Sequence, residues 1–185
     1  RRSSDLVLLI QFSIAGGFSR KNPLKLLWTM MPAYFTALGT QSSAATIPVT
    51  LEQARKNGVS EEIAGFTVPL CATIHMSGSI LKITACALAL MIMQGLPYDF
   101  WMFFGFILML GITMVAAPGV PGGAIMASLG LLQSMLGVNE DAQELMIALY
   151  IAMDSFGTAC NVTGDGAIAI VVDRLLGKGE KVQDQ

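Results

Sequence analysis

The fold class of this chain is decided by residues 100–139, which read FWMFFGFILMLGITMVAAPGVPGGAIMASLGLLQSMLGVN and contain no Asp, Glu, Lys, Arg or His. A helix that crosses the hydrocarbon core of a membrane needs only about 20 apolar residues. The interior of a 185-residue soluble domain is too small to bury a charge-free stretch of this length. The stretch therefore predicts an integral membrane protein.

The composition of the whole chain agrees with a membrane environment. Hydrophobic residues make up 54% of the chain and charged residues only 13%, about half the charged fraction of a typical soluble domain. Cys71, Cys86 and Cys160 lie in apolar segments without metal-ligand spacing, so we expect small apolar filler there. The single histidine, without a nucleophile–base pair or a metal cluster, argues against an enzyme. Nothing indicates a cofactor or a nucleic-acid partner.

Two apolar blocks, 23–51 and 100–136, are interrupted in the middle. The first contains GTQSSAATIP at 39–48 and the second contains AAPGVPGG at 116–123. Proline removes a backbone donor and glycine weakens a helix, so neither block suits one continuous helix. Irregular backbone at membrane depth is tolerated only where protein or a cavity surrounds it. We therefore expect two re-entrant helical hairpins; a pair of ordinary kinked helices is the alternative.

The other two long blocks, 63–95 and 145–176, are unbroken, and each predicts one transmembrane helix. Residues 1–18 suggest the end of a further, truncated transmembrane helix, and residues 177–185 suggest a cytoplasmic tail. The expected fold is all-α and integral to the membrane, with the order hairpin, helix, hairpin, helix in an inverted-repeat arrangement. Interrupted segments in matching positions of two halves are the best sequence indication of a transporter binding site.

The basic residues predict how these segments are oriented. Cytoplasmic loops carry an excess of Lys and Arg, and one side of the membrane would carry Arg20, Lys21, Lys25, Arg55, Lys56, Arg174, Lys178 and Lys181. The loops at 97–99 and 138–144 carry neither residue type. The first hairpin would thus enter from the cytoplasm and the second from outside, in a multi-pass protein of the cytoplasmic (inner) membrane that contacts lipid.

Four polar residues follow one face of the block 145–176: Asp154, Thr158, Asn161 and Asp165. Their spacing of i, i+4, i+7 and i+11 places them on one side of a helix. A carboxylate within a span costs about 2.5–3.5 kcal/mol on insertion scales and usually marks a functional site. We expect this stripe to hold a small charged solute, with Asp154 facing an amino group. A structural hydrogen-bond seam between helices is the alternative.

The two interrupted regions supply complementary groups. Helix N-termini and exposed amides attract carboxylates, and Ser42 and Ser43 provide hydroxyls beside the first break. The second break, Gly119, Val120, Pro121 and Gly122, offers backbone groups with little side-chain bulk. We expect both tips to contact the substrate.

The block 63–95 contains two residues that are unusual inside a membrane, His75 and Lys82. They are seven residues apart and would share one helix face. We expect Lys82 either to pair with Asp165 or Asp154, or to extend its ammonium into a water-filled cavity.

These motifs together resemble the dicarboxylate/amino acid:cation symporters, the glutamate-transporter family. The resemblance covers about residues 23–177 and rests on TIPVT at 46–50, GVPG at 119–122 and NVTGD at 161–165. It implies that the two hairpins act as inner and outer gates. It also implies a homotrimer in which this core moves like an elevator against a scaffold formed by an N-terminal part of the protein.

The resemblance implies roles for the polar residues. Asp154 would bind the amino group of the substrate, with Thr158 beside it, and Asn161 and Ser43 would bind its main-chain carboxylate. Asp165, with Asn161, would be a ligand of one coupling sodium ion.

Gly157 departs from the family pattern. Members that take acidic substrates carry an arginine at this position, which holds the side-chain carboxylate in a bidentate fork. We therefore predict a neutral or bulky amino acid as the substrate, with cystine as a candidate. The alternative is a glutamate, aspartate or C4-dicarboxylate symporter in which another residue replaces the arginine.

The segment His75-Met76-Ser77-Gly78-Ser79 departs as well, because the family usually has Asn-Met-Asp-Gly-Thr there. A hard cation needs several oxygen ligands, whereas an imidazole suits protons and Lys82 offers a fixed positive charge. We expect symport driven by a sodium or proton gradient, with His75, Ser77 and Lys82 near the ion site. A channel or a non-transporting membrane protein is the alternative from a different class.

Overall fold

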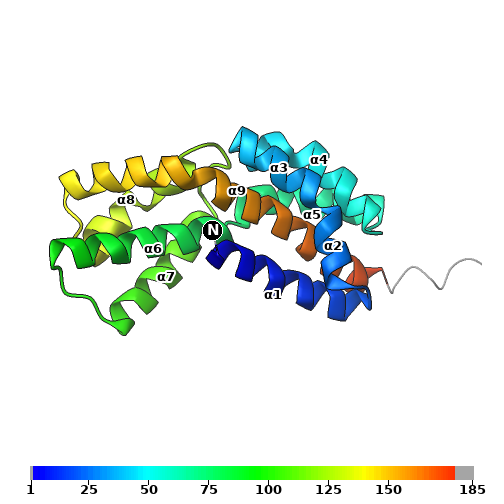
Figure 1. The fold of residues 1–185 in the computed structure, drawn as a ribbon, viewed down its shortest axis with the longest axis horizontal. Coiled ribbons are helices and arrows are strands. Elements are labelled where there is room, and N and C mark those ends of the chain that lie inside the picture. Colours follow the sequence, from blue (N-terminus) through cyan, green and yellow to red (C-terminus); the bar gives the residue numbers. More distant parts are fainter. Residues whose placement is uncertain (1, 178–185) are drawn as a thin grey trace, which may run out of the picture.

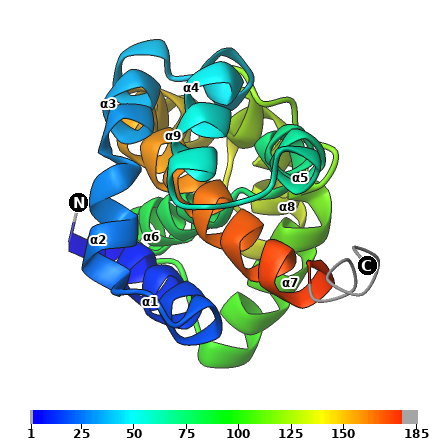
Figure 2. The same cartoon turned by 90° about the vertical axis from the view of Figure 1, so that its right-hand side faces the viewer.

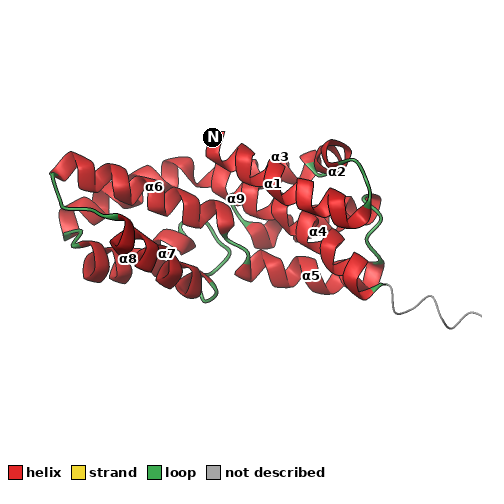
Figure 3. Ribbon diagram, turned by 90° about the horizontal axis from the view of Figure 1, so that it is seen from below, coloured by secondary structure: helices red, strands yellow, loops and turns green. Residues whose placement is uncertain are grey.

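The structure is a computed structural model that describes residues 2–177. Within this range the regular structure consists of nine α-helices without a strand (Figures 1 and 3). They are α1 (Arg2–Ser19), α2 (Pro23–Thr29), α3 (Met31–Thr40), α4 (Ser43–Lys56), α5 (Glu61–Ile74), α6 (Ser77–Gln94), α7 (Phe100–Met114), α8 (Gly123–Leu136) and α9 (Glu140–Leu176). Apart from Gly177, the tail expected over 177–185 lies outside the described residues.

The longest helix, α9, is the centre of the molecule. Its first half packs with α6 and α8, which in turn contact α7, and its second half packs with α1 to α5, which gives two bundles placed end to end (Figure 1). Seen along the long axis, α9 is surrounded by α1, α3, α4 and α5 (Figure 2). Residues 157–167 of α9 are all buried and mostly small. Small side chains let neighbouring helices approach closely, so α9 can be enclosed on every side.

The outer surface suits contact with lipid. Among the described residues, two stretches are long and apolar enough to cross a membrane, Glu61–Gln94 and Glu140–Leu176. Large apolar side chains are exposed on the outside, including Trp28, Phe66 and Trp101. Many large apolar side chains exposed on helices of this kind are typical of a surface that contacts lipid or another protein.

The second interrupted block forms two helices joined by a loop, whereas the first forms three, because Met30 separates α2 from α3. In the first, α3 and α4 are joined by Gln41 and Ser42 alone, and Gln41 takes a left-handed conformation with φ 52°. The sequence predicted a longer break, through Pro48, but Pro48 lies inside α4. Proline is tolerated within membrane helices where neighbouring groups satisfy the backbone. In the second pair, residues 115–122 connect α7 to α8.

The prediction of a single unbroken helix over 63–95 is wrong in one respect. The segment is divided into α5 and α6 by His75 and Met76, and His75 has an extended backbone (φ −90°, ψ 94°). The break is stable because a side chain replaces a helical acceptor: the amide of Gly78 donates to Asn161 Oδ1 at 2.8 Å. That acceptor comes from α9, so a local sequence pattern does not reveal it.

Gly78 provides a direct test of this packing. A Cβ at Gly78 would lie 2.7 Å from the carbonyl oxygen of Gly157 and 2.8 Å from Cys160 Cβ, both rigidly held. We expect Gly78→Ala to destabilise the protein by about 1–3 kcal/mol, the usual cost of overpacking. The measurement is the thermal unfolding temperature of the purified full-length protein in detergent.

The control is Gly65→Ala, since a Cβ at Gly65 meets nothing within 4 Å. This change should leave the unfolding temperature equal or slightly higher, because alanine favours the helix over glycine. Equal unfolding temperatures for the two variants would contradict the close contact at Gly78.

Candidate substrate and ion site

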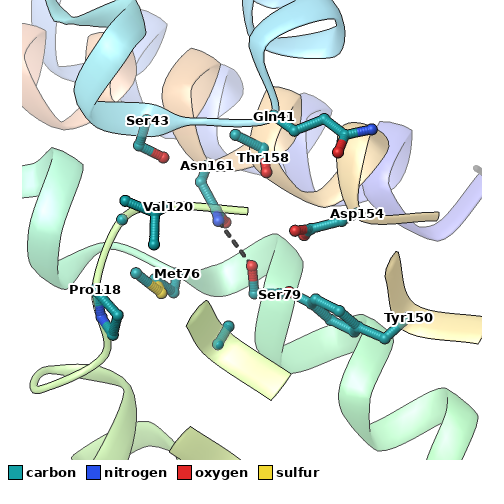
Figure 4. A pocket seen from close by; sticks show the side chains of 12 residues that line it. Gln41, Ser43, Met76, Ser79, Pro118, Val120, Tyr150, Asp154, Thr158 and Asn161 are labelled. Atoms are coloured by element: carbon teal, nitrogen blue, oxygen red, sulfur yellow. Dashed lines mark hydrogen bonds between the residues drawn. The ribbon is translucent and has the colours of Figure 1, made fainter. Parts of the chain in front are cut away.

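A cavity lies where the two bundles meet, between both interhelical loops, the break between α5 and α6, and the middle of α9 (Figure 4). Six of the residues that the sequence predicted for the substrate site line it: Ser43, Gly119, Val120, Asp154, Thr158 and Asn161. Four others, Ser42, Pro121, Gly122 and Gly157, do not line the cavity. Residues more than a hundred positions apart in the sequence therefore meet at one point.

Asp154 is bonded to the tip of the second helix pair. Its Oδ2 accepts a hydrogen bond from the amide of Gly122 at 3.0 Å, and its side chain is buried. Gly122 is the N-cap of α8 and has φ 74°, a left-handed conformation that glycine adopts without strain. The carboxylate thus receives the positive end of a helix dipole from one side. It also faces the cavity, as Figure 4 shows, so it can accept from a bound cation.

Ser42 joins the tips of the two helix pairs. Its hydroxyl donates to the carbonyl of Gly119 at 3.0 Å, and the same oxygen accepts from the amide of Ala45 as the N-cap of α4. Ser43, the next residue, points its hydroxyl towards the cavity (Figure 4). The two serines predicted together thus differ: Ser42 holds the loops, and Ser43 faces the site.

Asn161 connects α9 to the start of α6. Besides accepting from Gly78, it donates from Nδ2 to the hydroxyl of Ser79 at 3.0 Å, and both residues are buried. Its amide group is therefore committed on both sides. The role of Asn161 as a substrate or sodium ligand stays a prediction.

Asp165 forms a second polar centre, away from the cavity. Its Oδ1 lies 2.8 Å from Nδ1 of His75, and it is almost completely buried. The other ring nitrogen of His75 lies 2.9 Å from the Ser77 hydroxyl and 3.1 Å from Nε2 of Gln11. A Cβ at Gly164 would lie 2.5 Å from His75 Cε1, so a glycine is needed at that position for this approach. The four polar residues predicted on one helix face therefore belong to two places. Asp154, Thr158 and Asn161 line the cavity, and Asp165 bonds to His75.

Lys82 pairs with neither carboxylate within the part of the chain that the structure describes. Its ammonium donates instead to the carbonyl of Met153 and lies 5.0 Å from the centre of the Tyr150 ring. The side chain crosses α9 at Gly157.

Sequence reasoning missed several residues of the site. Gln41, Met76, Ser79, Pro118, Ala124 and Tyr150 also line the cavity. Tyr150 could have been found, because it lies one helical turn before Asp154 and extends the polar stripe. Gln41 lies in the interruption that predicted the first tip. Gln11 was an isolated polar residue in the first apolar segment, but nothing in the sequence placed it beside His75.

A buried carboxylate enclosed by two interrupted helical segments in an apolar helical protein is typical of the binding site of a membrane transport protein. This chain belongs to the sodium:dicarboxylate symporter family, whose pattern matches residues 4–175. The family assignment predicted from the sequence motifs is confirmed.

The sequence of this chain is about equally similar to several individual transporters. The neutral amino acid transporter B(0) of Mus musculus is 32% identical over 162 residues, which cover 85% of this chain and 29% of that protein. The serine/threonine transporter SstT of Acinetobacter baylyi is 32% identical over 160 residues, 84% of this chain and 40% of that protein. Excitatory amino acid transporter 1 of Rattus norvegicus is 35% identical over 162 residues, 85% of this chain and 29% of that protein. The chain thus spans well under half the length of these relatives.

The bond between Asn161 and Gly78 predicts a specific loss of stability. Asn161→Leu keeps a similar volume but leaves the Gly78 amide and the Ser79 hydroxyl without their partner. An unsatisfied buried polar group costs about 1–3 kcal/mol. We expect a clearly lower thermal unfolding temperature for the full-length protein in detergent.

Thr163→Val is the matched control two residues along α9. The Thr163 hydroxyl is buried and has no hydrogen-bond partner in the described structure. Its removal should therefore leave stability unchanged or slightly higher. A Thr163→Val variant that loses as much stability as Asn161→Leu would show that the bonds to α6 are not the cause.

Proposed function

We propose that this chain forms the substrate-binding part of a secondary active symporter, which carries an amino acid across the cytoplasmic membrane together with a coupling ion. The observation that supports this proposal best is Asp154, a buried carboxylate that lines a cavity and bonds to the tip of a helix pair. A negative charge so far from water is expensive unless a cation or hydrogen-bond donors satisfy it. The ammonium of an amino acid would supply that cation.

The cavity offers partners for both ends of an amino acid. Asp154 and Thr158 would bind the amino group, while Ser43 and the amides near Gly119 and Val120 would bind the main-chain carboxylate. The names of the relatives, which refer to neutral amino acids, serine/threonine and excitatory amino acids, support the amino-acid class. Because α9 has Gly157 where members with acidic substrates carry an arginine, α9 alone predicts a neutral or bulky amino acid as the substrate, with cystine as a candidate.

The helix pairs would act as gates. In this proposal α3–α4 enters the membrane from the cytoplasm and α7–α8 from outside, and the core moves like an elevator against a scaffold in a homotrimer. The amide of Gly122 and a substrate ammonium would use the same carboxylate. Substrate binding and the position of the α7–α8 tip are then linked through Asp154.

Sodium is the coupling ion that the family name implies, but Asp165 is not free to bind it as a simple oxygen ligand. One carboxylate oxygen is bonded to His75, and Ser77 bonds the same ring. A hard cation at Asp165 would need the oxygens of Asp165 and Ser77 together with other oxygen ligands nearby. We propose that this chain couples to fewer sodium ions than members with Asn and Asp in this segment, or to protons.

The central prediction concerns Asp154. Asp154→Asn removes the charge that would balance an ammonium but keeps the shape, so we expect uptake of every amino acid to be lost. The assay is uptake into proteoliposomes containing the full-length protein, with cystine, serine, alanine, aspartate and succinate offered separately. Glu144→Gln removes an exposed charge near the start of the same helix and should retain uptake.

Two outcomes would contradict this assignment. Full amino-acid uptake by Asp154→Asn would mean that the amino group binds elsewhere. Equilibration without accumulation against a gradient would identify a channel rather than a symporter.

The coupling proposal predicts a gain of sodium dependence. The double variant His75→Asn/Ser77→Asp frees Asp165 from the imidazole and adds a carboxylate, which provides the oxygen ligands that sodium needs. We expect its uptake rate to depend more steeply on sodium concentration than that of the wild type. The measurement compares uptake under separate sodium and proton gradients, with Ser77→Ala as the control. An unchanged sodium dependence would exclude this segment as the cause of altered coupling.

A further inference from the structure

Lys82 is a positive charge that interacts with its negative neighbour Asp154 only from a distance, without forming an ion pair. It lies on α6, within a stretch long and apolar enough to cross a membrane, and its side chain is partly buried. No ion pair of Lys82 exists among the described residues. Charged side chains at such depth normally pair with one another, with backbone carbonyls or with a substrate. One carbonyl, that of Met153, is the only hydrogen-bond acceptor that the described structure gives it.

The path of Lys82 depends on Gly157. A Cβ on residue 157 would lie 2.8 Å from the Lys82 Nζ atom, 2.9 Å from Cδ and 3.3 Å from Cε. Any side chain at position 157 would therefore displace the lysine from α9. Lys82 can therefore lie across α9 only because residue 157 is a glycine.

The ammonium lies behind one wall of the substrate cavity. It is 5.0 Å from the ring centre of Tyr150, and this ring lines the cavity together with Ser79 and Asp154. Figure 4 shows the side chains of Ser79, Tyr150 and Asp154 on one side of the cavity. Ser79 lies one helical turn before Lys82 on α6, and Tyr150 lies one turn before Asp154 on α9. The cation is thus beside the cavity and close to the carboxylate that would bind an amino group.

We propose that Lys82 recognises a second, negatively charged group of the substrate, so that this chain takes amino acids whose side chain carries a carboxylate. The inference rests on the proposed function, because it assumes that Asp154 binds the amino group. The site then has one negative and one positive end, which match the ammonium and the distal anion of the substrate. The neutral class expected from Gly157 is revised, since α6 supplies the charge that α9 lacks.

The chemistry of lysine fits this role. An ammonium has three donors, and only one of them is used by Met153. Its four-carbon stem is flexible, so rotation of the stem can move the charge from the Met153 carbonyl to a substrate carboxylate. The lysine acts as a point charge rather than a planar fork. It should therefore accept side chains of different lengths, which a fixed arginine fork would distinguish.

The test is the ratio of kcat/KM for aspartate and glutamate to kcat/KM for alanine, measured with the full-length protein in proteoliposomes. Lys82→Met keeps the length of the stem and removes the charge. We expect this ratio to fall about tenfold or more, since a hydrogen bond between charged groups has that effect. Lys82→Arg retains the charge and should keep most of the preference. If Lys82→Met does not insert into the membrane, Lys82→Gln serves with the same expectation.

A second change tests whether the charge itself, rather than its helix of origin, decides the preference. In the double variant Lys82→Met/Gly157→Arg, the lysine no longer occupies the space beside α9, and an arginine can extend from position 157. We expect the preference for acidic amino acids to return. Recovery supports a charge-recognition site at this place.

The following results would overturn the inference. An unchanged ratio in Lys82→Met, even if uptake of all amino acids falls together, would identify Lys82 as a packing residue or a counter-ion for Asp154. An equal loss of the ratio in Lys82→Arg would mean that charge is not the property selected. A wild type that takes up alanine and serine through Asp154 but not acidic amino acids would reject the inference and leave the proposed function intact. Lack of uptake of any amino acid would reject the proposed function itself.

Discussion

The structure depends on side chains that satisfy backbone groups where the helices are interrupted. Inside a bilayer, an unpaired amide or carbonyl has no water to bond and costs several kcal/mol. Each interruption here has such a partner: Asn161 accepts from Gly78 at the break between α5 and α6, Asp154 accepts from Gly122 at the start of α8, and Ser42 accepts from Ala45 at the start of α4. Two of these three partners come from α9. A continuous, buried central helix is therefore what allows the other segments to be broken.

This arrangement explains why structural and binding groups coincide. A carboxylate that stabilises the α8 N-terminus is also the strongest available acceptor for a cation in the cavity. Asn161, whose side chain holds α6 against α9, leaves Gly78 and Ser79 little freedom to move. A ligand that enters this cavity must replace hydrogen bonds that the protein already makes within itself. Its binding free energy therefore reflects only the difference between the new hydrogen bonds and those that they replace. Close packing at Gly78, Gly157 and Gly164 keeps those groups within reach of one another.

Much of the architecture could be predicted because its causes are local. Charge-free length predicted the membrane class, Gly and Pro clusters predicted the two interhelical loops, and helical spacing predicted that Asp154, Thr158 and Asn161 share a face. What could not be predicted depends on contacts between distant segments. The break at His75 and Met76 needs an acceptor from α9, and Pro48 fails to end α4 although proline often ends a helix. The pairing of His75 with Asp165 spans 90 positions, and the position of Lys82 follows from a missing side chain at Gly157.

The segment from His75 to Ser79 connects the two polar centres. His75 and Ser77 bond towards Asp165 and Gln11, whereas Gly78 and Ser79 bond to Asn161 at the cavity. This segment of five residues thus contacts both Asp165 and Asn161 of the polar stripe, and the helical hydrogen-bond pattern is interrupted at His75 and Met76. A displacement that changes the Asp165 contacts would also move the Ser79 wall of the cavity. The interruption that sequence patterns failed to indicate is therefore the part of the fold that connects the Asp165–His75 pair to the cavity beside Asp154.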